Sequence, residues 1–127
     1  MGREPGQRRV VTRKPAYQPD RRHLVYLDFT PHAGSEQAGR RPALVLSPKE
    51  FNVATGLMYA CPITNQVKGG SFEVRLPRGS RITGVVLADH MRSVDWIARR
   101  AEFHAEANED LMQEVLGRIA AILLIDR

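Results

Sequence analysis

The sequence predicts a mainly β domain that ends in an α-helix. Between residues 23 and 97, short apolar runs recur about every ten residues, and segments with Gly, Pro, Asn and Ser separate them. Short strands at this spacing are typical of a small barrel or sandwich. Beyond residue 107 the apolar residues follow a helical period instead. A chain of 127 residues has room for one domain of this kind.

The strand predictions depend on runs that are rich in β-branched, aromatic and other apolar residues. These runs cover residues 23–29, 42–47, 57–64, 72–76, 85–88 and, more weakly, 94–97. Turn signals separate them at residues 31–39, 48–56, 68–71 and 77–84. The sequence therefore predicts five strands and a weaker sixth.

The C-terminal segment is predicted as an amphipathic helix. Asn108 is a good N-cap residue, and the acidic Glu109 and Asp110 follow it in the first turn, where negative charge is favourable. The apolar stripe of the helix consists of Leu111, Val115, Leu116, Ile119 and Leu123.

Residues 1–22 differ from the rest of the chain in composition. They hold three of the eight prolines and seven basic residues, without any apolar periodicity. Such composition favours disorder. We therefore predict a disordered basic arm at 1–22 and one folded domain at 23–127, and we expect the arm to be dispensable for the activity of the domain.

The charge is unevenly distributed along the chain, whose formal net charge is +5. Residues 40–100 contain ten basic and four acidic residues, whereas residues 101–127 contain two basic and six acidic residues. This separation indicates a cationic face and a partner that is rich in negative charge, of which nucleic acid is the commonest. A solvated surface with a basic tail would give the same charge map.

Cysteine content and hydropathy point to the cytoplasm and away from a membrane. Cys61 is the single cysteine, so the chain cannot form an internal disulfide. The longest apolar run, at 119–125, is far shorter than the ~20 residues of a membrane-spanning helix. We expect a cytoplasmic protein without a membrane partner.

The candidate chemistry is concentrated in the segment between the first two predicted strands. The sequence has no Cys/His pairs at metal-ligand spacing, no phosphate-binding Gly-rich loop and no nucleophile-elbow serine, which argues against a metal or covalent enzyme. The segment at 31–42 instead places the carboxylate of Glu36 close to the guanidinium groups of Arg40 and Arg41. On its own, such a segment is more often a surface turn than a site.

The amino-acid sequence of this segment resembles the signature of the MazF/PemK family of toxin endoribonucleases. The similar run is Gly34-Ser-Glu-Gln-Ala-Gly-Arg-Arg-Pro-Ala-Leu-Val-Leu-Ser-Pro48, and Leu27-Asp-Phe29 precedes it. Further segments match the family in order: Pro62-Ile-Thr-Asn-Gln66, Lys68-Gly69, Phe72-Glu-Val74, Val86-Leu-Ala-Asp89, Arg92-Ser93 and Trp96. The resemblance covers about residues 23–126.

The resemblance implies a small SH3-like barrel that ends in a helix and forms a homodimer. It implies cleavage of single-stranded RNA at short sequence motifs without a cofactor or metal, and inhibition by a MazE-like antitoxin. The family's catalytic positions fall on Arg41, Thr64 and Glu36. The positions expected to contact RNA are Arg40, Asn65, Gln66, Lys68, His90 and Arg92. His90 stands where members of the family usually have Gln, which bears on sequence preference more than on catalysis.

RNA supplies its own nucleophile, the ribose 2′-OH, so cleavage requires only a base, an acid and stabilisation of charge. Glu36 is the expected proton acceptor, although the family match also allows Arg41 in that role. A guanidinium gives up its proton reluctantly, so we expect Arg41 mainly to hold phosphoryl oxygens while Thr64 donates a hydrogen bond to them. Without the family match, Thr64 would be read as a turn residue, and Glu36 as neutralising its arginine neighbours.

Two other functions stay open on the sequence alone. The same barrel could belong to a non-catalytic, CcdB-like toxin that binds a protein target, although Arg41 together with Thr64 argues against it. A plain basic nucleic-acid-binding module would also explain the charge map.

Overall fold

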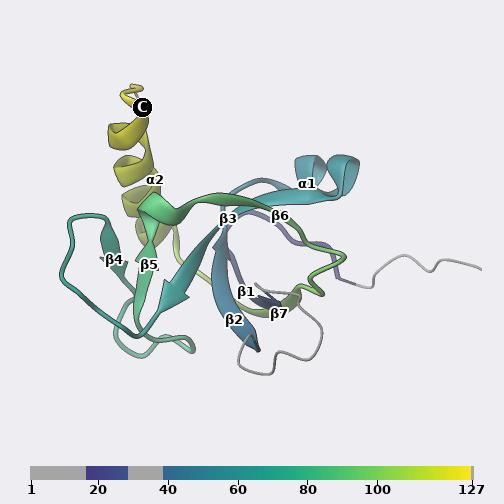
Figure 1. Cartoon of the computed structure of the whole chain (residues 1–127), viewed down its shortest axis with the longest axis horizontal. Helices are drawn as coiled ribbons and strands as arrows, with labels where there is room; N and C mark the ends of the chain where they lie inside the picture. The colour runs from purple at the N-terminus through teal and green to yellow at the C-terminus, as the bar shows by residue number, and fades with distance from the viewer. Residues whose placement is uncertain (1–16, 29–38, 127) are drawn as a thin grey trace, which may run out of the picture.

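The computed structural model describes residues 17–28 and 39–126, and these form one curved antiparallel sheet with two α-helices (Figure 1). The strands are β1 (His23–Asp28), β2 (Arg40–Val45), β3 (Leu57–Thr64), β4 (Glu73–Arg75), β5 (Val85–Leu87), β6 (Arg92–Asp95) and β7 (Glu102–Glu106). The helices are α1 (Lys49–Thr55), the 3-10 turn η1 (Ala88–His90) and α2 (Glu109–Leu123). The prediction of a mainly β domain with a C-terminal helix is confirmed.

Strand β3 is the centre of the sheet, whose order is β4-β5-β3-β2-β1-β7 with β6 also paired to β3. The first half of β3 pairs with β6 through Leu57–Ala60, and its end pairs with β5 through Ile63 and Thr64. On its other side β3 pairs with β2. In the described residues β4 and β7 end the sheet and do not pair with each other, so the predicted barrel is an open, strongly curved sheet.

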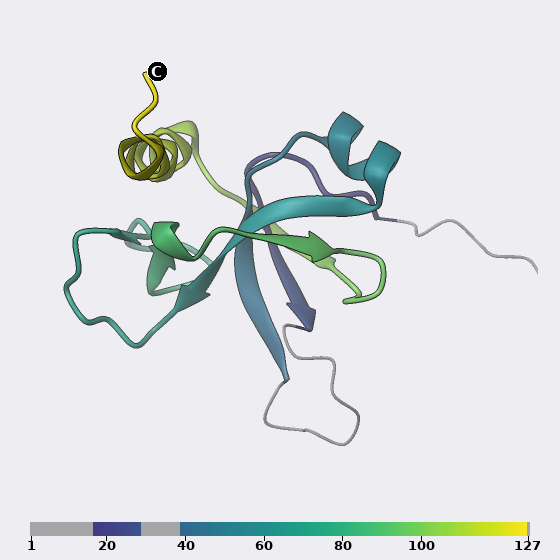
Figure 2. The same cartoon turned by 45° about the horizontal axis from the view of Figure 1, so that its top comes forward.

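The two faces of the curved sheet bury separate cores because successive side chains of a strand point in opposite directions. One core, with Leu44, Ile63 and Val86, lies between the sheet and α2. The other, with Leu27, Met58 and Trp96, lies in the concave part formed by β1, β2, β3 and β6. Figure 2 shows the separation: α2 lies beside the β4–β5 part of the sheet, whereas α1 lies at the other end of β3.

Helix α2 has the N-cap that the sequence predicts. The side chain of Asn108 accepts a hydrogen bond from the backbone N–H of Leu111 at 2.8 Å. The helix buries Leu111, Met112, Val115, Ile119 and Ala120. Its last turn is apolar but exposed, and Leu124, which ends the helix, is 90% exposed. The apolar stripe therefore covers the core only along the first three turns.

Two elements were not predicted. The segment read as a turn at 48–56 forms α1, and β7 lies in a stretch without strand signals. Helix α1 is short and buries a single residue, the polar Asn52, so it has no apolar stripe that a sequence pattern could reveal. Strand β7 pairs only with β1, at the edge of the sheet, and its side chains are exposed or half-buried.

Residues 17–22, which the sequence assigns to the arm, contact the sheet and α1. The Asp20 carboxylate accepts a hydrogen bond from the N–H of Lys49 at 2.8 Å, at the start of α1. The buried amide of Asn52 donates to the carbonyl oxygen of Pro19 at 3.0 Å. The backbone N–H of Arg22 donates a hydrogen bond to the carbonyl oxygen of Val45, and the carbonyl oxygen of Arg22 accepts one from the N–H of Ala107. The domain boundary at residue 23 stays a prediction. It can be tested by removing the residues that make these contacts.

The free thiol of Cys61 lies inside the core beneath η1. The side chain has no exposed surface, and its sulfur lies 3.9 Å from the carbonyl oxygen of Ala88. Burial raises the pKa of the Cys61 thiol to about 12, with a smaller contribution from the Asp89 carboxylate. Cys61 is therefore a packing residue.

The helices of the described residues are all too short or too polar to cross a membrane.

Candidate functional site

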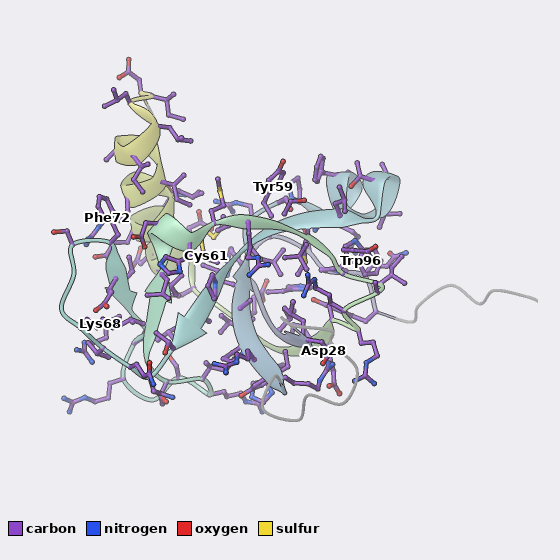
Figure 3. The ribbon with its side chains drawn as sticks, viewed as in Figure 1. Asp28, Tyr59, Cys61, Lys68, Phe72 and Trp96 are labelled. Atoms are coloured by element: carbon purple, nitrogen blue, oxygen red, sulfur yellow. The ribbon has the colours of Figure 1, made fainter. Side chains whose placement is uncertain are left out.

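A groove of about 550 Å³ lies between the ends of β2 and β3, the segment that leads into β4, and η1. Figure 3 labels Lys68 and Phe72, which both belong to that segment. The polar side chains that line the groove are Arg41, Thr64, Gln66, Lys68, Ser71, Glu73, Asp89, His90 and Arg92. A smaller hollow of about 310 Å³ adjoins it, and Arg41 and Thr64 line both. The structure thus brings together six of the residues that the sequence predicts as RNA contacts or catalytic groups on one surface, with Arg40 and Asn65 in the adjoining hollow.

Arg41 reaches the groove because of its position in β2. It follows Arg40 directly, so the two side chains point to opposite faces of the strand. Arg41 is exposed, and within the described part of the chain its guanidinium is engaged in no ion pair or hydrogen bond. A guanidinium presents several N–H donors in a planar fork that fits two phosphoryl oxygens. As far as the described residues are concerned, Arg41 is therefore available to bind an anion.

Thr64 is the last residue of β3 and lies at the border of the groove. Its hydroxyl oxygen accepts a hydrogen bond from the backbone N–H of Gln66 at 3.0 Å. A hydroxyl has one proton to donate and two lone pairs that accept. Because the N–H of Gln66 uses a lone pair, the proton of Thr64 remains available for an oxygen in the groove.

A carboxylate holds the turn that carries Lys68. The side chain of Glu73 accepts hydrogen bonds from the backbone N–H groups of Lys68, at 3.1 Å, and Gly69, at 2.8 Å. These bonds keep the pKa of the Glu73 carboxyl below its usual value. The fixed turn places the ammonium group of Lys68 at the rim of the groove.

The 3-10 turn and β6 supply the opposite side of the groove. His90 and Asp89 are neighbours in η1, with 3.8 Å between Nε2 of His90 and Oδ1 of Asp89. Arg92 follows at the start of β6 and is exposed. Two further groove residues, Asp89 and Glu73, lie in segments that carry the family resemblance but are not among the predicted site residues. The Asp89 carboxylate is a hydrogen-bond acceptor in a groove whose other charged groups are mostly cationic. It could accept a hydrogen bond from an N–H group of a nucleobase.

Arg40 lines the smaller hollow but not the groove, and its guanidinium binds within the protein. Its guanidinium donates to the Asp28 carboxylate at 3.1 Å and also to the carbonyl oxygens of Tyr26 and Arg100. Asp28 accepts a second bond from Arg100, and this bond, with the charges of Arg100 and Arg40, keeps the pKa of Asp28 below its usual value. The structure gives Arg40 a structural role, and a contact between Arg40 and RNA stays a prediction.

Glu36 lies outside the described residues, as does the rest of segment 29–38. Its role as proton acceptor therefore stays a prediction. Among the residues that the structure does describe, no cluster of three or more His, Cys, Asp or Glu side chains could hold a metal ion.

The fold and the groove define a small β protein whose open, cationic surface suits the phosphate backbone of a single-stranded nucleic acid. The chain belongs to a family of that kind: residues 20–123 match the PemK-like, MazF-like toxins of type II toxin–antitoxin systems. The match spans most of the chain, which confirms the family resemblance read from the sequence.

Relatives of known activity are similar over nearly their whole length. The endoribonuclease toxin MazF of Escherichia coli K12 is 42% identical over 107 residues, which are 84% of this chain and 96% of the relative. The crystal structure of MazF from Deinococcus radiodurans is 58% identical, with a TM-score of 0.78 over 86% of this chain and 99% of that one. The matching chain in a MazE–MazF complex from the same organism is 52% identical, with a TM-score of 0.78. The match covers 87% of this chain and 99% of that one.

Proposed function

We propose that this chain is a toxin that cleaves single-stranded mRNA at short sequences without a metal ion. The observation that carries the proposal is the meeting of Arg41 and Thr64, from two different strands, at one groove of a chain that belongs to the MazF/PemK family. Relatives such as MazF of Escherichia coli are endoribonucleases. A non-catalytic toxin or a plain basic binding module would have no need for this pair.

In the proposed reaction the ribose 2′-oxygen attacks the adjacent phosphorus. An O2′–P bond forms and the P–O5′ bond breaks, which leaves a 2′,3′-cyclic phosphate and a 5′-hydroxyl end. Glu36 accepts the 2′-OH proton, and the departing 5′-oxygen takes a proton from an acid or from water. Arg41 and Thr64 hold the non-bridging oxygens, whose charge grows in the transition state.

The other groove residues bind the RNA chain. Lys68 and Arg92 lie on opposite sides of the groove and attract phosphates. Gln66 and His90 offer side-chain hydrogen bonds to base edges, which single-stranded RNA leaves accessible.

The proposal predicts that the purified protein cuts a long RNA in the presence of EDTA. The ends should be a 2′,3′-cyclic phosphate and a 5′-hydroxyl, because the substrate itself supplies the nucleophile. Mapping the cut positions and testing whether the 5′ ends accept phosphate from polynucleotide kinase without prior dephosphorylation checks this. Strict dependence on Mg²⁺, or 5′-phosphate ends, would show a different reaction. Binding of RNA without cuts would favour the basic binding module.

We propose that the toxin is a homodimer, because large apolar side chains are exposed in two groups. Phe51 of α1 stacks on Tyr59 of β3 with ring centroids 5.9 Å apart, and Tyr59 is 42% exposed. The second group is the end of α2, where Ile122, Leu123, Leu124 and Ile125 are exposed. Contiguous apolar surface of this kind usually marks an interface.

The dimer proposal predicts that Leu123→Glu shifts the protein to a monomer in sedimentation velocity runs at micromolar concentration. A charge at a buried interface is costly to desolvate. Val67→Glu is the matched control, since Val67 is similarly exposed but lies beside the groove. A wild-type monomer at that concentration would refute the proposal, and a dimeric Leu123→Glu variant would exclude the end of α2 from the interface.

We propose a MazE-like antitoxin as the partner, as in the complexes of the Deinococcus relative. A cationic groove that attracts RNA also attracts an acidic, extended segment, so the two should compete. Titrating the antitoxin into a complex of toxin and fluorescent RNA analogue should release the RNA, and release should weaken at high salt. A ternary complex with undiminished RNA affinity would show separate sites.

We also propose that the toxin works in the cytoplasm, where its mRNA substrate is made and where Cys61 would remain reduced. Fractionation of cells that express a tagged, inactive variant tests this location.

A further inference from the structure

The end of β3 packs closely against the residue that precedes β5. Gly84 has a φ of +111°, and a Cβ added there would lie 2.3 Å from the carbonyl oxygen of Thr64 and 2.8 Å from its carbonyl carbon. No side chain fits at such distances from a backbone, and L-residues rarely adopt this φ. Gly84 therefore allows β5 to approach the backbone of Thr64, and Thr64 pairs with Val85 in the sheet.

Asn65, the first residue after β3, is held by the residue that precedes Gly84. The hydroxyl of Thr83 donates a hydrogen bond to the side-chain oxygen of Asn65 at 3.0 Å. With that oxygen occupied, the –NH₂ of the Asn65 amide remains available as a donor. Asn65 lines the smaller hollow together with Arg41 and Thr64. Asn65 therefore lies on the same surface as Arg41 and Thr64.

The segment that makes both contacts is itself anchored. The carbonyl oxygen of Gly84 accepts a hydrogen bond from the N–H of Leu76 at 3.0 Å, just beyond β4. Leu76 is a buried core residue, and so is Ile82, two residues before Gly84. Residues 83 and 84 thus form a fixed support for the corner between β3 and the following loop.

We propose that Thr83 and Gly84 are positioning residues of the toxin. Gly84 sets the backbone of Thr64 so that its hydroxyl meets the scissile phosphate. Thr83 fixes the Asn65 amide so that its –NH₂ donates to an oxygen of the RNA beside that phosphate. Neither residue takes part in bond making or breaking. This inference deepens the proposed endoribonuclease function and depends on it.

The first test compares Gly84→Ala with Gly79→Ala. Both glycines have positive φ, +111° and +87°, but nothing lies within 4 Å of a Cβ at Gly79. Gly79→Ala therefore carries the backbone strain without the collision. We expect Gly84→Ala to lower kcat at least tenfold, and Gly79→Ala to cleave within about twofold of the wild type. A folded Gly84→Ala protein with wild-type kcat would overturn the role of Gly84.

The second test does not depend on the folding of a Gly84 variant. Thr83→Val removes the hydroxyl at nearly constant shape and should lower kcat/KM about tenfold, whereas Thr83→Ser keeps the hydroxyl and should retain it. In an Asn65→Ala background, Thr83→Val should cause no further loss, because its effect passes through the amide. An equal loss in both backgrounds, or no loss in either, would overturn the role of Thr83.

A spectroscopic measurement separates this inference from the proposed function. The ¹⁵N–¹H signals of the Asn65 side-chain amide should shift in Thr83→Val and stay near their wild-type positions in Thr83→Ser. If the wild-type protein cuts no RNA, the endoribonuclease proposal fails whatever the amide signals show. If the wild-type protein cuts RNA but the amide signals are the same in all three proteins, only the inference fails.

Discussion

Arg41→Ala is expected to lower kcat for RNA cleavage about a hundred- to a thousandfold. The guanidinium is a charged donor to oxygens whose negative charge grows in the transition state, and loss of such a donor typically costs ~3 to 4 kcal/mol of barrier. The side chain is exposed at the groove and supports no core contact. The melting temperature should therefore stay close to that of the wild type. Single-turnover cleavage of a fluorescent oligonucleotide, with thermal unfolding by circular dichroism, checks both values.

Two further variants show whether the loss is specific to the Arg41 guanidinium. Arg41→Lys keeps the charge but loses the fork, so we expect an intermediate kcat. Arg78→Ala removes one exposed arginine from a different hollow, near Pro77 and Ala105, and should change kcat little. Equal losses in Arg41→Ala and Arg78→Ala would mean that overall charge, and not phosphate contact, is what matters. A large fall in melting temperature would assign Arg41 to the fold.

Removing residues 1–22 is expected to destabilise the domain by about 3 kcal/mol or more, and to lower its melting temperature on the order of 10–20 °C. The shortened chain loses the Pro19 carbonyl that binds the buried Asn52 amide, the Asp20 carboxylate at the start of α1, and both backbone bonds of Arg22. Most of this loss of stability comes from the buried Asn52 amide, which would be left without a hydrogen-bond acceptor.

A chain that starts at Tyr17 is the matched control, since it keeps all of these contacts. We expect its melting temperature to equal that of the full chain. Its RNA affinity should be weaker only at low salt, because residues 1–16 carry basic charge that binds phosphates without sequence preference. If the chain that starts at His23 is as stable as the one that starts at Tyr17, the predicted boundary at residue 23 stands. A changed cut motif in either chain would mean that the arm reads bases.

Local patterns were sufficient to predict the elements whose side chains alternate cleanly between core and surface. The predicted strand at 57–64 coincides with β3, and the capped helix begins one residue after Asn108. Helix α1 was read as a turn because its one buried residue, Asn52, is polar. Asn52 bonds to the nearby Ser47 and also to Pro19 and Trp96, which lie 33 and 44 positions away along the chain.

The site could be predicted only in part, because several of its features depend on contacts between residues far apart in the sequence. Family motifs named Arg41 and Thr64, but the sequence alone could not tell that Arg40 is committed to Asp28 across the β1–β2 pair. The contact of Thr83 with Asn65 joins residues 18 positions apart and leaves no periodic signal. Close approaches such as that of Gly84 to Thr64 depend on how two strands pack, which becomes visible only in three dimensions.

The buried thiol beneath η1 makes this toxin convenient for site-specific labelling. Cys61 is the single cysteine of the chain and has no exposed surface, and its raised pKa keeps it in the unreactive thiol form at neutral pH. Maleimide dyes and nitroxide spin labels should therefore leave the native protein unmodified. A second cysteine placed at an exposed position, such as Arg78, would accept a single probe, so that distances to labelled RNA or antitoxin could be measured without first removing Cys61.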